Sequence, residues 1–354
     1  MPMTGREATM AFGVLGTNSW GVPTSVTRRV YFESDAGLTS QPAYVDDASF
    51  GQAFLGAADV GDFAPVEATL SGQAYYDHAD YILEAMAMGS PNAVTVVSSV
   101  AANSLVAYQH ILDLAPNTNG RGITLATDKV QFVEEVTSAK VRGFALSVGT
   151  GGVMQKRISI IGGKSTMASA VNTRSAVSTS ALAPSLVNRI FRDQGTWYLN
   201  AQAAGSLAAA DVLADVMDAT IEFDRPLSPA MVFGSDYTIE PLDGGFPTSR
   251  VTMRMARATT VSTNSLYAAM QAGTVMKGRV TFTGGYINST TQRQWSLEFP
   301  HAEVQGHQFS VSGADQAQPD VTLVLKQATA APTGFSHVRP FRLTRITSQS
   351  LVAF

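Results

Sequence analysis

The sequence predicts a mainly β protein with a few helices, built from two related halves. Three observations lead to this prediction: many strand-like runs, few stretches with helical spacing, and segments of the first half that reappear in the same order in the second. The chain of 354 residues is long enough for two domains and for a sizeable core without cross-links.

Strand signals dominate the chain. In Val251–Met255, odd positions are apolar and even positions are polar, so one face of the strand is expected in the core. Val26–Glu33 is rich in β-branched and aromatic residues, which favour strands. The other strand-like runs are Val66–Tyr75, Ala139–Val148, Lys156–Ile161, Ala219–Phe223, Arg250–Thr259, Gly278–Thr283, Gln294–Phe299, Gln308–Val311 and Val321–Lys326.

Helical spacing is confined to a few stretches. Asp77–Met88 places apolar residues on one stripe, with Asp77 as a candidate N-cap and Gly89 as a candidate left-handed residue past the end. The two other helical stretches are Ser262–Gln271, which is followed by Gly273, and the alanine-rich Ala208–Met217.

Four segments indicate an internal repeat, in the order strand, long loop, strand, helix, strands. The members of the fourth pair lie closer together in the chain than those of the other three, which predicts extra residues in the first half, at Asn92–Gly120. The alternative is that strands of any β-sandwich look alike. The matched segments are Thr27–Ala36 with Asp218–Leu227, Phe63–Ala74 with Phe246–Arg257, Ala79–Gly89 with Thr263–Gly273, and Val136–Val148 with Phe299–Val311.

A Ser/Thr/Ala-rich stretch without periodicity begins near residue 165 and separates the two halves. We interpret it as a linker, although it could also dock as irregular structure. The predicted division is an N-terminal arm at 1–24, a first β domain at 25–164, a linker at 165–195 and a second β domain at 196–354.

The composition argues against several functional classes. The formal net charge of −4 is unlike that of a basic nucleic-acid reader, and the absence of cysteine excludes disulfides and thiolate chemistry. We recognise no secretory signal, no apolar run long enough for a membrane helix and no catalytic constellation, so we expect neither an enzyme nor a cofactor or metal site. Charged residues make up only 15% of the chain, and a surface of small residues suits burial between subunits.

Two loops are too long for ordinary connectors, at Leu38–Asp62 and Leu227–Phe246. Carboxylates gather in them, and a solvated loop is the simplest interpretation. We predict that these loops and the arm Met1–Thr24 contact neighbouring assemblies of the same chain. The candidate contact residues are Asp46, Asp47, Asp59, Asp62, Asp236, Glu240 and Asp243.

Three patterns carry a resemblance to a known family. They are the Gly-x-x-x-Trp-Gly-x-Pro element at Gly16–Pro23, the strand and helix ending in glycine at Val66–Gly89, and the late strand Trp295–Val304 with its proline and acidic residue. In these features the chain resembles the major tail tube proteins of long-tailed bacteriophages. The resemblance implies β-sandwich or barrel domains, each flanked by one helix, in rings that stack into a hollow tube.

The resemblance also implies partners and a location. Members with two fused domains form trimeric rings with pseudo-sixfold symmetry, and members with one domain form hexamers. The expected partners are further copies of the chain, the tape-measure protein, the tail terminator and the distal tail protein. DNA would pass through the lumen without specific binding, and an acidic wall would repel its phosphates. The chain would be made in the bacterial cytoplasm and reside in the virion tail, without membrane contact.

Three alternatives remain open from the sequence. The second half could be a decoration domain, usually immunoglobulin-like, beside a single tube domain. The chain could be a capsid or tail decoration protein that does not polymerise into a tube. It could also be a carbohydrate-binding β-sandwich, which would need paired carboxylates and aromatic platforms in a cleft.

Overall fold

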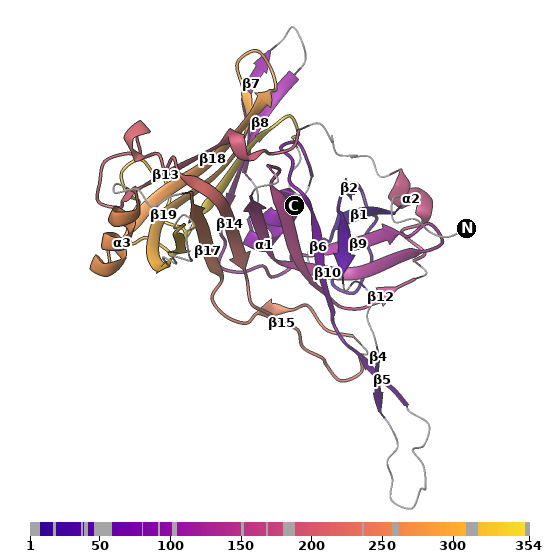
Figure 1. Ribbon diagram of the computed structural model, residues 1–354. Coiled ribbons are helices and arrows are strands. Elements are labelled where there is room, and N and C mark those ends of the chain that lie inside the picture. Colours follow the sequence, from indigo (N-terminus) through magenta and orange to yellow (C-terminus); the bar gives the residue numbers. More distant parts are fainter. Residues whose placement is uncertain are drawn as a thin grey trace, which may run out of the picture.

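A computed structural model shows a mainly β protein with few helices, as the sequence predicts (Figure 1). It describes residues 8–16, 19–36, 38, 42–45, 59–79, 81–90, 93–100, 105–149, 152–167, 169–179, 188–235, 237–256, 262–308 and 318–350.

The strands and helices have the following bounds. The strands of the first half are Thr9–Val14 (β1), Arg28–Val30 (β2), Ser34–Ala36 (β3), Pro42–Val45 (β4), Asp59–Phe63 (β5), Val66–Gln73 (β6), Ala93–Val100 (β7), Leu105–Asp113 (β8), Ile123–Asp128 (β9), Val133–Val148 (β10), Gln155–Gly162 (β11) and Ser165–Thr166 (β12). Those of the second half are Gly195–Ala201 (β13), Val216–Asp224 (β14), Leu227–Ser228 (β15), Leu242–Asp243 (β16), Thr248–Met255 (β17), Met276–Tyr286 (β18), Gln292–Gln308 (β19), Asp320–Leu325 (β20) and Arg342–Thr347 (β21). The helices are Tyr81–Met88 (α1), Arg174–Ser178 (α2) and Ser262–Ala272 (α3), with short 3-10 turns at Arg192–Gln194 and Ala209–Asp211.

The two halves repeat one antiparallel strand order. In the first half, the hydrogen-bonded order is β3–β6–β11–β10–β9–β1. In the second half, it is β14–β17–β20–β19–β18–β13. Strands at equivalent positions in the two sheets also follow one another in the same sequence along the chain. Only the inserted elements between them differ.

The repeat extends to individual residue pairs. Glu67 faces Ile161 across β6 and β11, and Arg250 faces Val324 across β17 and β20. Glu67 therefore corresponds to Arg250, as the second pair of matched segments predicts. Ile161 corresponds to Val324, and these two residues are as far apart in the chain as the members of the fourth pair of segments. Bulges also fall at positions that the fourth match makes equivalent, between Val141 and Gly143 in β10 and between Val304 and Gly306 in β19.

The two longer helices end in the same way. Gly89 and Gly273, which the third sequence match aligns, both have positive φ, of 68° and 62°. In each case the glycine N–H and the next N–H donate to carbonyls of the last turn, which is the left-handed helix ending that the glycines predict. Helix α1 packs against β10, and α3 packs against β19, the equivalent strand.

One matched segment was placed wrongly from the sequence. The first match aligns Thr27 with Asp218. In the structure Ser34 faces Ser71, and Asp218 faces Arg254, so β3 corresponds to β14 with Ser34 in the place of Asp218. The sequence match lies seven residues out of register, because runs of β-branched and aromatic residues recur in many strands and do not fix the alignment.

The hairpin β7–β8 interrupts the repeat. It occupies the stretch Asn92–Gly120, where the sequence predicts extra residues, and no strand lies between α3 and β18 in the second half as described. Strand β8 pairs with β21, which also pairs with β19 (Figure 1). The insertion of the first half is thereby joined to the sheet of the second half.

Other expectations are corrected by the structure. Ala208–Met217 is not a helix: it holds a 3-10 turn and the start of β14. Gln294–Phe299 belongs to a strand, β19, that continues as far as Gln308, because the bulge at Gly306 lets the strand proceed without a turn. Residues 9–14 of the predicted arm form β1, which pairs with β9 and β2.

Two further features depart from the expected local roles. Asp77 does not cap α1: its carboxylate accepts hydrogen bonds from the backbone N–H of Ser348, from Asn188 and from Arg293. Within the predicted linker, the Asn172 side chain is buried and donates to Thr24 O, while its oxygen accepts from Val26 N. Part of that stretch is therefore docked on the first half.

Two buried histidines make stability depend on pH. Burial lowers the pKa of His110 and of His337 to about 4, so both are neutral at pH 7. Because these pKa values lie below the unfolded value of roughly 6.5, their contribution is fully present above pH ~6.5 and is lost as the pH falls towards 4.

We expect Tm to fall between pH 7 and pH 4.5, and to fall less in the variant His110→Gln/His337→Gln. Thermal unfolding at the two pH values measures this difference. His301→Gln is the matched control, since the His301 side chain is partly exposed. An equal loss of Tm in the double variant and the wild type would contradict the assignment.

Candidate assembly interface

The two halves are joined edge to edge by strands β10 and β14. Gly143–Val148 of β10 pairs antiparallel with Ala219–Asp224 of β14. Because β11 pairs with the same part of β10, β14 lies on the opposite edge of that strand, beyond the end of β9. The sheets of the two halves therefore form one continuous surface.

Gly143 is required by this joint. A Cβ at this position would lie 2.3 Å from the carbonyl oxygen of Phe223 and 3.1 Å from Cα of Asp224, both in β14. Real Cβ atoms do not approach backbone so closely, so only glycine lets the two strands pair here. The aromatic rings of Phe144 and Phe223 meet beneath the joint, with centroids 5.5 Å apart.

The equivalent edge of the second half is open. Gly306 of β19 corresponds to Gly143, and β18 ends its pairing at Ala302 on that edge, as β9 does at Ala139. Among the described strands none pairs there, nor with the outer edge of β3, which corresponds to β14. Among the described residues, a Cβ at Gly306 would meet the Thr322 side chain closely, at 3.3 Å, but no backbone atom nearer than Thr322 N at 4.0 Å.

One face of the continuous sheet is polar, and the other carries the core and both longer helices. Register places the outward side chains in rows that cross the joint, with Arg157, Ala145 and Glu222 as neighbours on successive strands. The core side chains alternate with them along each strand. Charged side chains of the polar face include Glu67, Arg142, Arg157, Asp218, Glu222, Asp224, Arg250, Arg254, Arg279, Glu298, Glu303 and Asp320.

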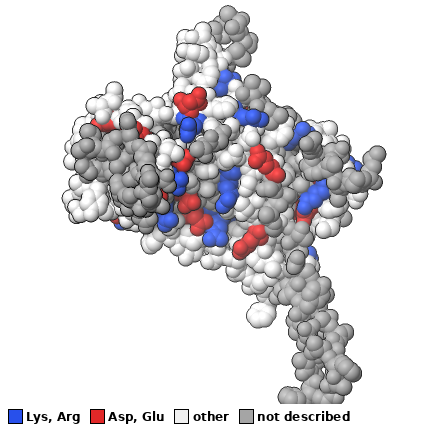
Figure 2. Space-filling model, in the orientation of Figure 1, with Lys and Arg blue, Asp and Glu red and all other residues white. Residues whose placement is uncertain are grey.

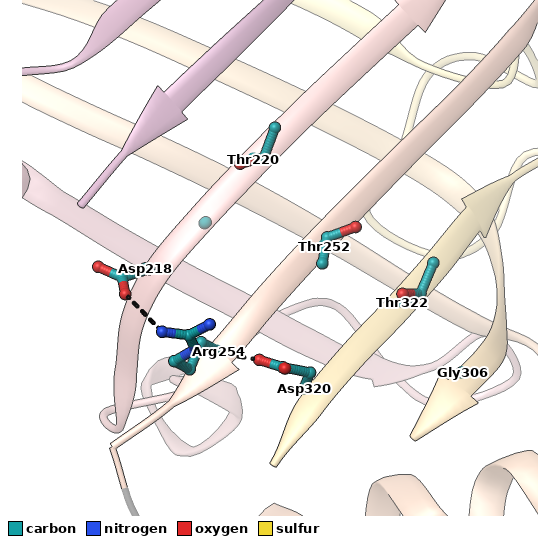
Figure 3. A pocket seen from close by; sticks show the side chains of 8 residues that line it. Asp218, Thr220, Thr252, Arg254, Gly306, Asp320 and Thr322 are labelled. Atoms are coloured by element: carbon teal, nitrogen blue, oxygen red, sulfur yellow. Dashed lines mark hydrogen bonds and ion pairs between the residues drawn. The ribbon is translucent and has the colours of Figure 1, made fainter. Parts of the chain in front are cut away.

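Opposite charges lie side by side on this face. Arg254 on β17 reaches Asp320 at 3.2 Å and Asp218 at 3.8 Å, beside a shallow pocket lined by threonines (Figure 3). Arg142 pairs with Asp224 across the joint at 3.0 Å. Acidic and basic side chains are also interspersed over the coloured part of the face shown in Figure 2. The polar face is therefore of mixed charge rather than acidic.

Two of the predicted contact carboxylates bind within the chain instead of pointing away from it. Glu240 contacts the ammonium of buried Lys140 at 2.8 Å and accepts a hydrogen bond from Gly120 N. Asp243 pairs with the fully buried Arg225 at 3.1 Å and accepts from Thr118 N. Both side chains thus fix the base of the second long loop on the first half.

For the other five candidate carboxylates, the structure describes at most the backbone. Asp59 and Asp62 lie in β5, which pairs with β4, but their side chains are not described. Asp46, Asp47 and Asp236 lie outside the described residues. A contact role for all seven carboxylates stays a prediction.

Sequence reasoning missed the two glycines at the sheet edges. The signal was present in the fourth sequence match, where Val141-Arg142-Gly143 aligns with Val304-Gln305-Gly306. A shared glycine inside a strand pattern indicates a bulge or a close backbone approach. Only the pairing of β10 with β14 shows which of these the glycine serves.

The described residues hold no group of three or more histidine and acidic side chains suited to a metal ion. None of the described helices has the length and apolar character needed to cross a membrane.

Comparison with known proteins gives limited likeness. No family model matches the sequence, and no curated protein matches it. Among solved structures, one similar chain comes from the virion of a native gene transfer agent particle, with 11% identity and a TM-score of 0.29. Another comes from the tail of an empty gene transfer agent particle, with 12% identity and a TM-score of 0.28. Each match covers 41% of this chain and 97% of the other.

Proposed function

We propose that this chain is a structural virion protein, the subunit of a phage-type tail tube, in which three copies close a ring of six similar half-units. The observation that carries the proposal is the joint between β10 and β14. This joint is one lateral contact between two half-units. The equivalent edges, on β19 beyond Ala302 and on β3, pair with no other described strand.

The ring closes when β3 of one copy pairs with β19 of the next, as β14 pairs with β10. Such pairing satisfies the backbone groups of both open edges, which otherwise promote uncontrolled association. The glycine at 306 supports this arrangement, because among the described residues no backbone atom lies closer than 4.0 Å to a Cβ built there, whereas the backbone of an incoming strand would meet it.

The polar face of the sheet would line the lumen, since the core and the longer helices occupy the other face. Arg142 and Arg254 lie beside carboxylates, which reduces their attraction for phosphate. The wall would therefore let DNA pass because its arginines are paired with carboxylates, and not because it is the acidic wall considered with the family resemblance.

The duplicated strand order favours two tube-type domains over a tube domain with an immunoglobulin-like decoration. It likewise favours trimers over hexamers. The predicted domain limits, the location in the virion tail, and contacts with a tape-measure protein, a tail terminator and a distal tail protein belong to the same proposal.

Substitution of Gly306 tests ring closure. In Gly306→Ala, the added methyl group would collide with the backbone of the incoming edge strand, as a Cβ at Gly143 would with Phe223 O. We expect rings to be lost while the isolated chain loses less than about 1 kcal/mol of unfolding free energy. Native mass spectrometry and end-on electron micrographs measure assembly, and urea unfolding measures stability.

Gly285→Ala is the matched control, because a Cβ at Gly285, on β18 of the same half, meets nothing within 4 Å. It should assemble like the wild type. Rings of Gly306→Ala with normal yield and symmetry would refute closure at this edge, and a wild-type chain that stays monomeric at all concentrations would refute the ring itself.

A further inference from the structure

The loop between β14 and β17 presents an apolar tip to solvent. Phe233 is fully exposed at the tip, next to the partly exposed Met231 and Val232, while Phe246 and Leu242 are exposed nearer the base of the loop. The tip turns at Gly234, whose φ is 86°, and Ile239 N donates to Ala230 O to close the turn. Contiguous exposed apolar side chains, here Met231, Val232 and Phe233, are typical of a contact site.

The base of this loop is held in place by the rest of the chain. The Trp20 indole N–H donates to Thr238 O, and Lys140 Nζ donates to Pro241 O. Together with the Arg225–Asp243 pair, these contacts fix the direction in which the tip projects. A contact made by the tip would therefore cost little ordering of the loop.

A cavity of about 170 Å³ opens at the other end of the same strand, with Arg192 and Thr196 among apolar side chains in its lining. The loop follows Asp224 at the end of β14, whereas the cavity takes in Val216 and Met217 at its start. Eight residue steps of roughly 3.4 Å separate these ends by about 27 Å. The apolar lining residues are Val148, Trp197, Val212, Leu213, Val216, Met217 and Phe282.

We infer that Phe233 of one copy seats in this cavity of a second copy, so that rings stack head to tail. The inference rests on the proposed function and names the contact between successive rings. A cavity of roughly 150 Å³ can hold benzene, so the volume suits one phenyl ring, which would pack on Trp197, Leu213 and Phe282 of the lining. A tip at one end and its receptor at the other form a heterologous contact, which repeats without closing and generates filaments.

Disulfide trapping tests the contact directly, since the chain contains no cysteine of its own. In Phe233→Cys/Val212→Cys, oxidation should link copies into an open-ended ladder on a denaturing, non-reducing gel. A bridge within one chain is excluded by the separation of the two ends. Each single-cysteine variant should give dimers at most.

The single substitution Phe233→Ser should weaken stacking by at least about tenfold in sedimentation while leaving rings intact. Tyr286→Ser removes another exposed aromatic, on β18, and serves as the control that should stack normally. A double-cysteine variant that forms rings but no ladder, or Phe233→Ser tubes of normal yield, would overturn the stacking contact. Loss of rings in the wild type would instead count against the proposed function.

Discussion

Replacing Arg225 by methionine is expected to lower the free energy of unfolding by about 3–5 kcal/mol. The guanidinium is fully buried and lies where β14 ends. It donates to four backbone carbonyls of the first half and to Asp243 of the second-half loop. The acceptor carbonyls belong to Ala87, Met88, Ala115 and Pro116.

The physical reason is that the partners of Arg225 stay buried when the cation is removed. Ala87 and Met88 supply carbonyls at the end of α1, which have no partner further along the helix. Methionine fills much of the volume but donates no hydrogen bond, so these oxygens lose the guanidinium, and Met88 O keeps only the N–H of Ala115. Asp243 keeps the N–H of Thr118 but loses its buried counter-charge. Urea unfolding at constant pH measures the difference.

Arg142→Met is the matched control for this prediction. Arg142 also pairs with an aspartate across the two halves, but its side chain is 41% exposed and that of Asp224 is 46% exposed. Water and salt screen such a pair, so we expect a loss below about 1 kcal/mol. Equal losses in the two variants would show that burial does not decide the contribution of Arg225.

Breaking the buried pair of Arg345 and Glu84 is expected to cost a similar amount, about 3–5 kcal/mol. Arg345 on β21 and Glu84 on α1 are both almost fully buried, with Nη2 and Oε1 2.5 Å apart. The same guanidinium donates to Tyr75 O. In Glu84→Gln, the arginine would remain buried without its counter-charge.

A double-mutant cycle separates the pair from its surroundings. The variant Glu84→Leu/Arg345→Met removes both charges, and we expect it to be more stable than either single variant, because no unpaired charge is left in the core. Thermal and urea unfolding of the four proteins give the coupling energy. Additive single and double losses would contradict a direct interaction.

Both pairs join the first half to the second, and this bears on the meaning of the repeat. Arg225 and Arg345 belong to second-half elements, and each acts on α1 or the segment after β8. Together with the β10–β14 joint and the β8–β21 pairing, they make the two halves one packed unit. We therefore expect a single cooperative unfolding transition.

Much of the fold could be predicted because it depends on local pattern. Alternation identified β6, β11, β14, β17, β18 and β20 within a few residues of their observed bounds. Alternation fails where a strand is short or buried on both sides: β9 shows no exposed position, and its sequence was not recognised as a strand. The Ala-rich stretch at 208–217 misled helix prediction because alanine content alone does not provide packing.

The predicted contact residues show more clearly where prediction from local sequence fails. Glu240 and Asp243 were identified from their position in a long acidic loop. In the folded chain they pair with Lys140 and Arg225, two cations whose burial cannot be predicted from the local sequence pattern. The apolar tip at Phe233 lay in the same loop and was not recognised, because exposure of a single aromatic depends on what packs around it.

The sequence by itself determined the strand alternation, the two glycine-ended helices and the equivalences that relate β6 to β17, β10 to β19 and α1 to α3. These follow from side-chain period and from the left-handed conformation that glycine adopts readily. Only the tertiary structure decided that β14 lies along β10, that β8 lies along β21, and that Gly143 is enclosed while Gly306 is open. Edge pairing joins residues far apart in the chain, and any strand edge offers the same backbone groups, so which edges meet is decided by the packing of the whole molecule.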